Sequence, residues 1–75
     1  MKNESPSTNT VGKRIRLQRR VRCLTQQQLA DSIGVTQSAV ARWEADEAEP
    51  ALRHRKQLAE ILDVSISVLF DEVAA

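Results

Sequence analysis

Aromatic residues, glycine and cysteine are all scarce in this sequence of 75 residues, which has one Trp, one Phe, no Tyr, two Gly and one Cys. A hydrophobic core must therefore be built mainly from Ile, Leu, Val and Ala. A single cysteine excludes an internal disulfide and a cysteine-based metal cluster. No stretch approaches the roughly 18 apolar residues of a membrane span, and no apolar run follows the N-terminal charges. These absences favour one small domain in a bacterial-type cytoplasm.

Positive charge is concentrated in the first third of the chain, although the net charge is only +1. Residues 1–24 carry seven Lys or Arg and one acid, whereas residues 25–50 carry one Arg and five acids. The remaining residues, 51–75, carry three Lys or Arg and four acids. The basic segment is compatible with binding a polyanion, and the solvated face of an amphipathic helix would explain it about equally well.

The pattern of apolar residues predicts five helices and no strand. The expected helices cover residues 10–22, 25–34, 36–44, 51–62 and 66–71. Residues 1–9 are polar and contain a proline, so they are expected to form a disordered tail, and residues 72–75 are expected to fray. That leaves one domain at residues 10–71. The expected core faces are Val11, Ile15, Leu17 or Gln18, and Val21 in the first helix, and Leu52, Ala59 and Leu62 in the fourth.

Local signals define where the middle helices begin and end. Thr25 and Gln28 have the spacing of a capping box, in which each side chain satisfies a backbone N–H of the first turn. Gly34 suits the left-handed residue that ends a helix, and Thr36 suits the N-cap of the next one. Cys23 stands where a left-handed residue would be convenient, at some cost for a side chain with a β-carbon.

Two short helices around a glycine turn, over residues 25–44, predict a helix-turn-helix unit. The DNA major groove is about 12 Å wide and admits one α-helix, whose angle is fixed by a preceding helix that packs across it. Small Ala30 allows the two helices to approach closely, and Val35 and Val40 would anchor the second helix inward. The side chains left pointing outward are Gln37, Ser38, Ala41 and Arg42.

The four outward side chains have the chemistry of base recognition. Gln forms paired hydrogen bonds to adenine and Arg to guanine, Ser is adaptable, and Ala can touch a thymine methyl group. The alternative is that they are ordinary solvated residues, although a purely structural helix more commonly exposes Glu and Lys. The basic outer face of the first helix adds Arg14 and Arg16 as expected phosphate contacts.

The run GKRIRLQRRVRCLTQQQLADSIGVTQSAVARWEADEAEP resembles the Cro/repressor-type, or XRE-like, helix-turn-helix family. The later run LAEILDVSISVLF resembles the last two helices of that domain. The resemblance covers about residues 11–70. It implies an all-α, compact five-helix lambda-repressor-like domain, with the helix-turn-helix at helices 2 and 3, that binds double-stranded operator DNA as a dimer.

The resemblance assigns roles to individual residues of this chain. It implies phosphate contacts at the starts of the second and third helices, by Thr25, Gln26 and Thr36. Gln26 would also brace Gln37, and Arg19 and Glu44 would form a structural ion pair between the first and third helices. After Glu44 the chain departs from the family, because the usual phosphate-gripping residues are replaced by Ala45, Asp46, Glu47 and Glu49. This acidic loop is an unfavourable DNA contact, which the basic first helix would have to offset.

The C-terminal part is more apolar than one short helix can bury. Contacts between two copies are expected at Ile66, Val68, Phe70 and Val73, and the alternative role of these residues is to close the core. We predict a sequence-specific transcriptional regulator, most simply a repressor on a palindromic operator, with no enzymatic activity, cofactor, metal, membrane or small-molecule partner. The alternatives are an antitoxin-like or anti-repressor-like protein-interaction module, and the DNA-binding part of a larger repressor.

Overall fold

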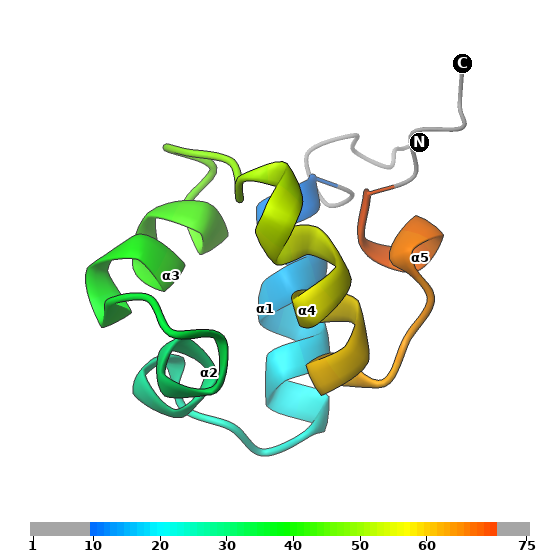
Figure 1. The fold of residues 1–75 in the computed structure, drawn as a ribbon, viewed down its shortest axis with the longest axis horizontal. Coiled ribbons are helices and arrows are strands. Elements are labelled where there is room, and N and C mark those ends of the chain that lie inside the picture. Colours follow the sequence, from blue (N-terminus) through cyan, green and yellow to red (C-terminus); the bar gives the residue numbers. More distant parts are fainter. Residues whose placement is uncertain (1–9, 71–75) are drawn as a thin grey trace, which may run out of the picture.

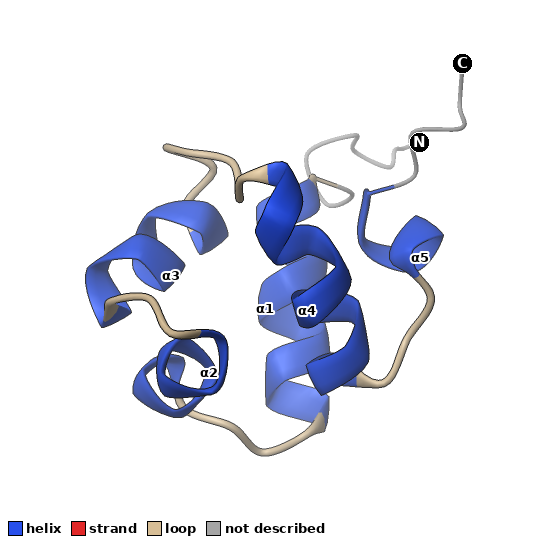
Figure 2. Ribbon diagram, viewed as in Figure 1, coloured by secondary structure: helices blue, strands red, loops and turns tan. Residues whose placement is uncertain are grey.

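Five helices and no strand make up the part of the chain that the computed structural model describes, residues 10–70 (Figure 2). The helices are α1 (Val11–Val21), α2 (Gln26–Ile33), α3 (Gln37–Glu44), α4 (Leu52–Leu62) and α5 (Ile66–Phe70). α2 and α3 lie on one side of α1 and α4, and α5 lies on the other (Figure 1). The predicted all-α, five-helix architecture is therefore confirmed. The predicted tail and frayed end, residues 1–9 and 72–75, lie outside the described residues.

Threonine side chains begin the first three helices. The hydroxyl groups of Thr10, Thr25 and Thr36 each accept a hydrogen bond from a backbone N–H three residues further on. At Thr25 the predicted capping box is complete, because the Gln28 side chain accepts from the Thr25 N–H at 2.8 Å. Each such cap contributes about 1 kcal/mol to helix stability. Local sequence thus defines where these helices begin.

The connections between helices use left-handed residues where the chain must reverse. Gly34 has a φ of 88° and ends α2, as its type predicts. Cys23, between α1 and α2, has a φ of 58°, and Asp63, at the end of α4, has a φ of 59°. A residue with a β-carbon is strained in this region, by roughly 1–2 kcal/mol. The strain at Cys23 and Asp63 must therefore be offset by the packing of the helices that they join.

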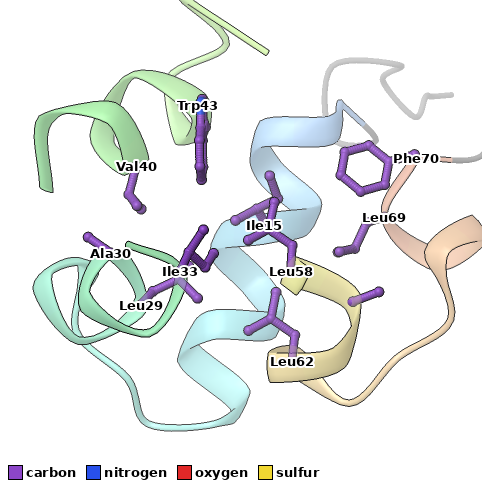
Figure 3. Packing of buried hydrophobic residues seen from close by; sticks show 11 residues of the cluster. Ile15, Leu29, Ala30, Ile33, Val40, Trp43, Leu58, Leu62, Leu69 and Phe70 are labelled. Carbon is purple, nitrogen blue, oxygen red and sulfur yellow. The ribbon is translucent and has the colours of Figure 1, made fainter. Parts of the chain in front are cut away.

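A single hydrophobic core receives side chains from all five helices (Figure 3). Its largest fully buried members are Ile15, Leu29, Val40, Leu58, Leu62 and Leu69. Trp43 enters from α3 and is 6% exposed, and Phe70 closes the side next to α5. Burying one such side chain stabilises the fold by about 1.5–3 kcal/mol before the conformational entropy is subtracted. The core therefore holds α3 against the rest of the domain.

Three residues expected in the core lie on the surface instead. Leu17 and Val21 of α1 are 59% and 62% exposed, and Leu52 of α4 is 76% exposed. Each residue turns an α-helix by about 100°, so Leu17 lies roughly 200° around α1 from buried Ile15. The apolar stripe predicted for the first helix therefore included residues on both sides of α1, whereas the side with Ile15 faces the core. Leu52 is the first residue of α4 and lies beyond the region that the other helices cover.

Candidate nucleic-acid interface

The helix-turn-helix unit is held together at the turn between α2 and α3. The backbone N–H groups of Gly34 and Val35 both donate to the carbonyl of Ala30, at 2.8 and 3.0 Å. Ala30 itself is fully buried, so its small side chain allows α2 to pack closely within the core. A β-carbon added at Gly34 would meet nothing within 4 Å. Glycine is therefore favoured at this turn because of its backbone conformation and not because space is limited.

The side chains predicted to read bases gather on the outer side of α3. Gln37, Ser38 and Arg42 are exposed and Ala41 is half-buried, whereas Val40 and Trp43 of the same helix enter the core. Because Val40 and Trp43 hold one face of α3 against the core, the hydrogen-bonding groups on its other face are turned to solvent. Such a face is the part of a helix that a nucleic-acid groove can meet.

The ion pair between Arg19 and Glu44 fastens the C-terminal end of α3 to α1. Arg19 Nε donates to Glu44 Oε2 at 2.6 Å and a second guanidinium nitrogen donates to Oε1 at 3.0 Å. A third nitrogen of Arg19 donates to the Leu24 carbonyl at 2.7 Å. The hydrogen bond to Glu44 raises the pKa of Arg19, partial burial opposes the rise, and attraction to the carboxylate adds to it. Arg19 therefore stays cationic at every physiological pH.

A chain of side-chain hydrogen bonds continues from this ion pair to the reading face. Gln26, in the first turn of α2, donates from Nε2 to Glu44 Oε1 at 3.1 Å. Gln37, in the first turn of α3, donates from Nε2 to Gln26 Oε1 at 3.3 Å. One polar network thus joins α1, the ends of α3 and the start of α2. The contact between Gln26 and Gln37 is the brace that the resemblance implied, but its link to Glu44 was not anticipated.

The acidic loop after α3 has a structural function that sequence reasoning missed. Asp46 has a φ of 61°, and its carboxylate accepts from the Thr10 hydroxyl at 2.7 Å and from the Gly12 N–H at 3.0 Å. The carboxylate therefore caps the start of α1, where the helix dipole favours negative charge. The residues lie 34 positions apart, so no local signal could have identified the contact.

Gly12 allows this closure because it has no side chain. A β-carbon at Gly12 would lie 2.3 Å from the Trp43 carbonyl oxygen and 2.7 Å from the Asp46 carboxylate. The close approach brings the backbone of α1 against the end of α3. The position of α3 is therefore determined by backbone contact as well as by the Arg19–Glu44 pair.

A family model described as Helix-turn-helix matches residues 15–69, which is more than half of the chain. This chain belongs to the helix-turn-helix family. The predicted kinship with its Cro/repressor-type, XRE-like members is confirmed by the family match and the solved structures described next. No curated protein matches the sequence significantly.

Three solved structures share the fold. The P22 c2 repressor in complex with synthetic operator 9T is 32% identical, with a TM-score of 0.77 over 80% of this chain and 91% of that one. SinR, a master regulator for biofilm formation in complex with DNA, is 27% identical, with a TM-score of 0.76 over 83% and 100%. The restriction-modification controller protein C.AhdI from Aeromonas hydrophila is 32% identical, with a TM-score of 0.74 over 80% and 87%.

The basic residues of this helix-turn-helix protein do not share one environment. Arg16 is exposed, whereas Arg14 is half-buried and donates to the Leu69 carbonyl at 3.4 Å, which directs it toward α5. Arg22 donates to the Leu62 carbonyl and to the Asp63 carboxylate, both at 3.1 Å, and so caps α4. A shallow hollow of about 270 Å³ on the outside of α1 is lined by Lys13, Arg16, Leu17 and Arg20. Of the two predicted phosphate contacts in α1, only Arg16 is presented freely to solvent.

The residues expected at a contact between copies differ in their exposure to solvent. Ile66 and Val68 are 46% and 44% exposed on α5. Phe70 is 7% exposed, and the Arg55 guanidinium lies 4.9 Å from its ring centroid, so Phe70 closes the core and offers no surface for a partner. Val73 lies outside the described residues. Within residues 10–70, no group of three metal-ligating side chains and no helix able to cross a membrane is present.

Proposed function

We propose that this chain is a sequence-specific regulator of transcription that binds double-stranded DNA with α3 in the major groove. The observation that carries the proposal is the ordered network from Arg19 through Glu44 and Gln26 to Gln37, which ends on the exposed face of α3. A side chain held in one orientation can discriminate among base edges better than a mobile one. Gln37, Ser38 and Arg42 would contact bases, and Ala41 would contact a thymine methyl group.

The starts of α2 and α3 are suited to contact phosphates on either side of the groove. The first backbone N–H groups of each helix have no partner within the helix and carry the positive end of its dipole. Thr25 and Thr36 stand at these starts, and Gln26 follows the first of them. The exposed Arg16 would add a phosphate contact from α1. These contacts would position α3 without reading the sequence.

The regulator would act as a dimer on a palindromic operator, as a repressor in the cytoplasm. Two copies of α3 would enter successive major grooves about 34 Å apart, since a two-fold dimer requires two half-sites one helical turn apart. The P22 c2 repressor structure contains an operator, and the SinR structure contains DNA, which supports a similar use of the same fold here. Exposed Ile66 and Val68 would supply an apolar contact between the copies.

Selection of bound duplexes from a randomised pool, followed by titration of the selected sequence, tests the proposal. Arg42→Ala should weaken binding by about 1–3 kcal/mol at one base position and relax specificity there. Arg16→Ala should weaken binding evenly on all sequences and reduce the salt slope by about one. Lys56→Ala, an exposed change on α4, serves as the charge-matched control. Absence of salt-dependent binding to any duplex would contradict the proposal and favour a protein-interaction module.

A further inference from the structure

The carboxylate of Glu44 takes part both in the ion pair with Arg19 and in the chain of hydrogen bonds that leads through Gln26 to Gln37. Its side chain is 4% exposed, and it accepts two hydrogen bonds from Arg19 and one from Gln26. We propose that Glu44 is a positioning residue that determines which base Gln37 recognises. This inference rests on the proposed binding of α3 in the major groove. Glu44 would exert this effect from the far end of α3, without touching DNA.

The direction of each hydrogen bond in the network follows from the chemistry of the Glu44 carboxylate. An ionised carboxylate only accepts, so Gln26 must turn its NH₂ group toward Glu44. The amide oxygen of Gln26 then faces Gln37 and can only accept, so Gln37 must turn its own NH₂ group toward Gln26. Reversing Gln26 would set its amide oxygen against the carboxylate, and reversing Gln37 alone would set two amide oxygens against each other, so either change loses a hydrogen bond and brings two acceptors together. The carboxylate therefore fixes the orientation of both amides.

The orientation of Gln37 determines which hydrogen-bonding groups remain for a base. With one N–H engaged by Gln26, Gln37 keeps its amide oxygen and its second N–H. This acceptor and donor match the N6 amino group and N7 of adenine in the major groove. A reversed Gln37 would accept from Gln26 and present two N–H donors, which match the O6 and N7 acceptors of guanine. Glu44 would thus select adenine over guanine at this position.

Glu44→Gln removes the constraint while preserving the size of the side chain. Its amide oxygen, placed at the Oε2 position, can still accept from Arg19 Nε. An NH₂ group at the Oε1 position gives up the second hydrogen bond from Arg19 and can donate to Gln26 Oε1. That donation permits the reversed arrangement of both Gln26 and Gln37. The variant should therefore accept guanine as well as adenine at one base position. A residue that only holds α3 in place would weaken all positions together when it is changed.

The test compares the sequences selected by the wild-type chain and by Glu44→Gln from one randomised duplex pool. A paired contact to one base is worth about 1–3 kcal/mol, which corresponds to a preference of between about 5-fold and 150-fold. Wild type should select adenine with a preference in this range at one position of each half-site. Glu44→Gln should reduce that preference at least fivefold in favour of guanine, with the position read by Arg42 unchanged. Circular dichroism establishes that both proteins are folded.

Gln26→Ala provides a second route to the same result, because it breaks the network and leaves the Arg19–Glu44 pair intact. It should also relax the adenine preference, and adding Glu44→Gln to it should change the preference no further. Unaltered adenine selection in both variants, or an equal loss at every position, would overturn the role of Glu44 while leaving the DNA-binding proposal standing. A wild-type chain that selects no sequence would instead remove the proposed function itself.

Discussion

The end of α3 and the outer side of α5 are held in place by different kinds of interaction. α3 is fastened by directional contacts: the Arg19–Glu44 pair, the Gln26 side chain and the close backbone approach at Gly12. α5 is a helix of five residues that is held mainly by Leu69 and Phe70 in the core, with one hydrogen bond from Arg14 to the Leu69 carbonyl, and it leaves Ile66 and Val68 exposed. Directional contacts fix an angle, whereas apolar burial fixes only proximity.

This difference matches what each region must do in the proposed function. A helix that reads bases has to be held within a fraction of an ångström, so its anchors are hydrogen bonds and backbone contact. A surface that meets a second copy needs apolar area and complementary shape, which exposed Ile66 and Val68 can supply. The following variants test whether the two regions differ in this way.

The largest effect is expected when the anchor of α3 is broken on one side. Glu44→Ala leaves the Arg19 guanidinium partly buried without its carboxylate, which should destabilise the fold by about 3–5 kcal/mol. Because the folded-state pKa of Arg19 is raised, this contribution is fully present below the unfolded-state pKa and is lost only as pH rises through the folded-state value, far above neutrality. Urea unfolding between pH 6 and 9 should therefore show a constant difference between wild type and variant. A difference that shrinks within this pH range would mean that the lost stability does not come from the Arg19–Glu44 ion pair.

The two glycines offer a matched test of steric contact against backbone conformation. Gly12→Ala places a β-carbon 2.3 Å from the Trp43 carbonyl and should cost about 3 kcal/mol or more, because backbone must move. Gly34→Ala meets no atom within 4 Å but holds a β-carbon at a φ of 88°, and should cost about 1–2 kcal/mol. Thermal unfolding measures both. Equal costs would mean that α1 does not press on the end of α3.

Sequence reasoning predicted the features that depend on neighbouring residues. The capping box of Thr25 and Gln28 and the left-handed turn at Gly34 are determined within a few residues, so they could be recognised from the sequence alone. The outward face of α3 followed from the same spacing, since Val40 and Trp43 point inward. The family resemblance supplied the arrangement of the five helices as a whole.

Features that depend on distant residues could not be predicted in the same way. The Asp46 contact with Gly12 spans 34 positions, and the Gln26 contact with Glu44 spans 18. The exposure of Leu52 also depends on which helices cover the start of α4, and periodicity does not report this. An aspartate in a loop is usually read as a solvated charge, whereas here the fold brings it to the start of a helix.

A smaller effect is expected at the loop that closes α3 onto α1. Asp46→Ala removes the acceptor of the Thr10 hydroxyl and the Gly12 N–H, and it keeps a β-carbon at positive φ, so it should cost about 1–2 kcal/mol. Asp46→Gly loses the same hydrogen bonds but relaxes the backbone, so its cost should be smaller. Urea unfolding of both variants separates the two contributions. A glycine variant less stable than the alanine variant would show that backbone strain at this position is unimportant.

The smallest change in stability is expected on α5, where the change in assembly should be largest. Ile66→Ser combined with Val68→Ser replaces exposed side chains and should alter the free energy of unfolding of the monomer by no more than about 0.5 kcal/mol per site. If these residues join two copies, sedimentation equilibrium should show a weaker dimer, and cooperative binding to a two-half-site duplex should fall with it. Leu52→Ser, at a more exposed leucine on α4, is the matched control and should leave the dimer intact. Equal dimerisation by wild type, the double variant and Leu52→Ser would mean that Ile66 and Val68 do not join the two copies. Phe70 could not replace them, because it is buried in the core.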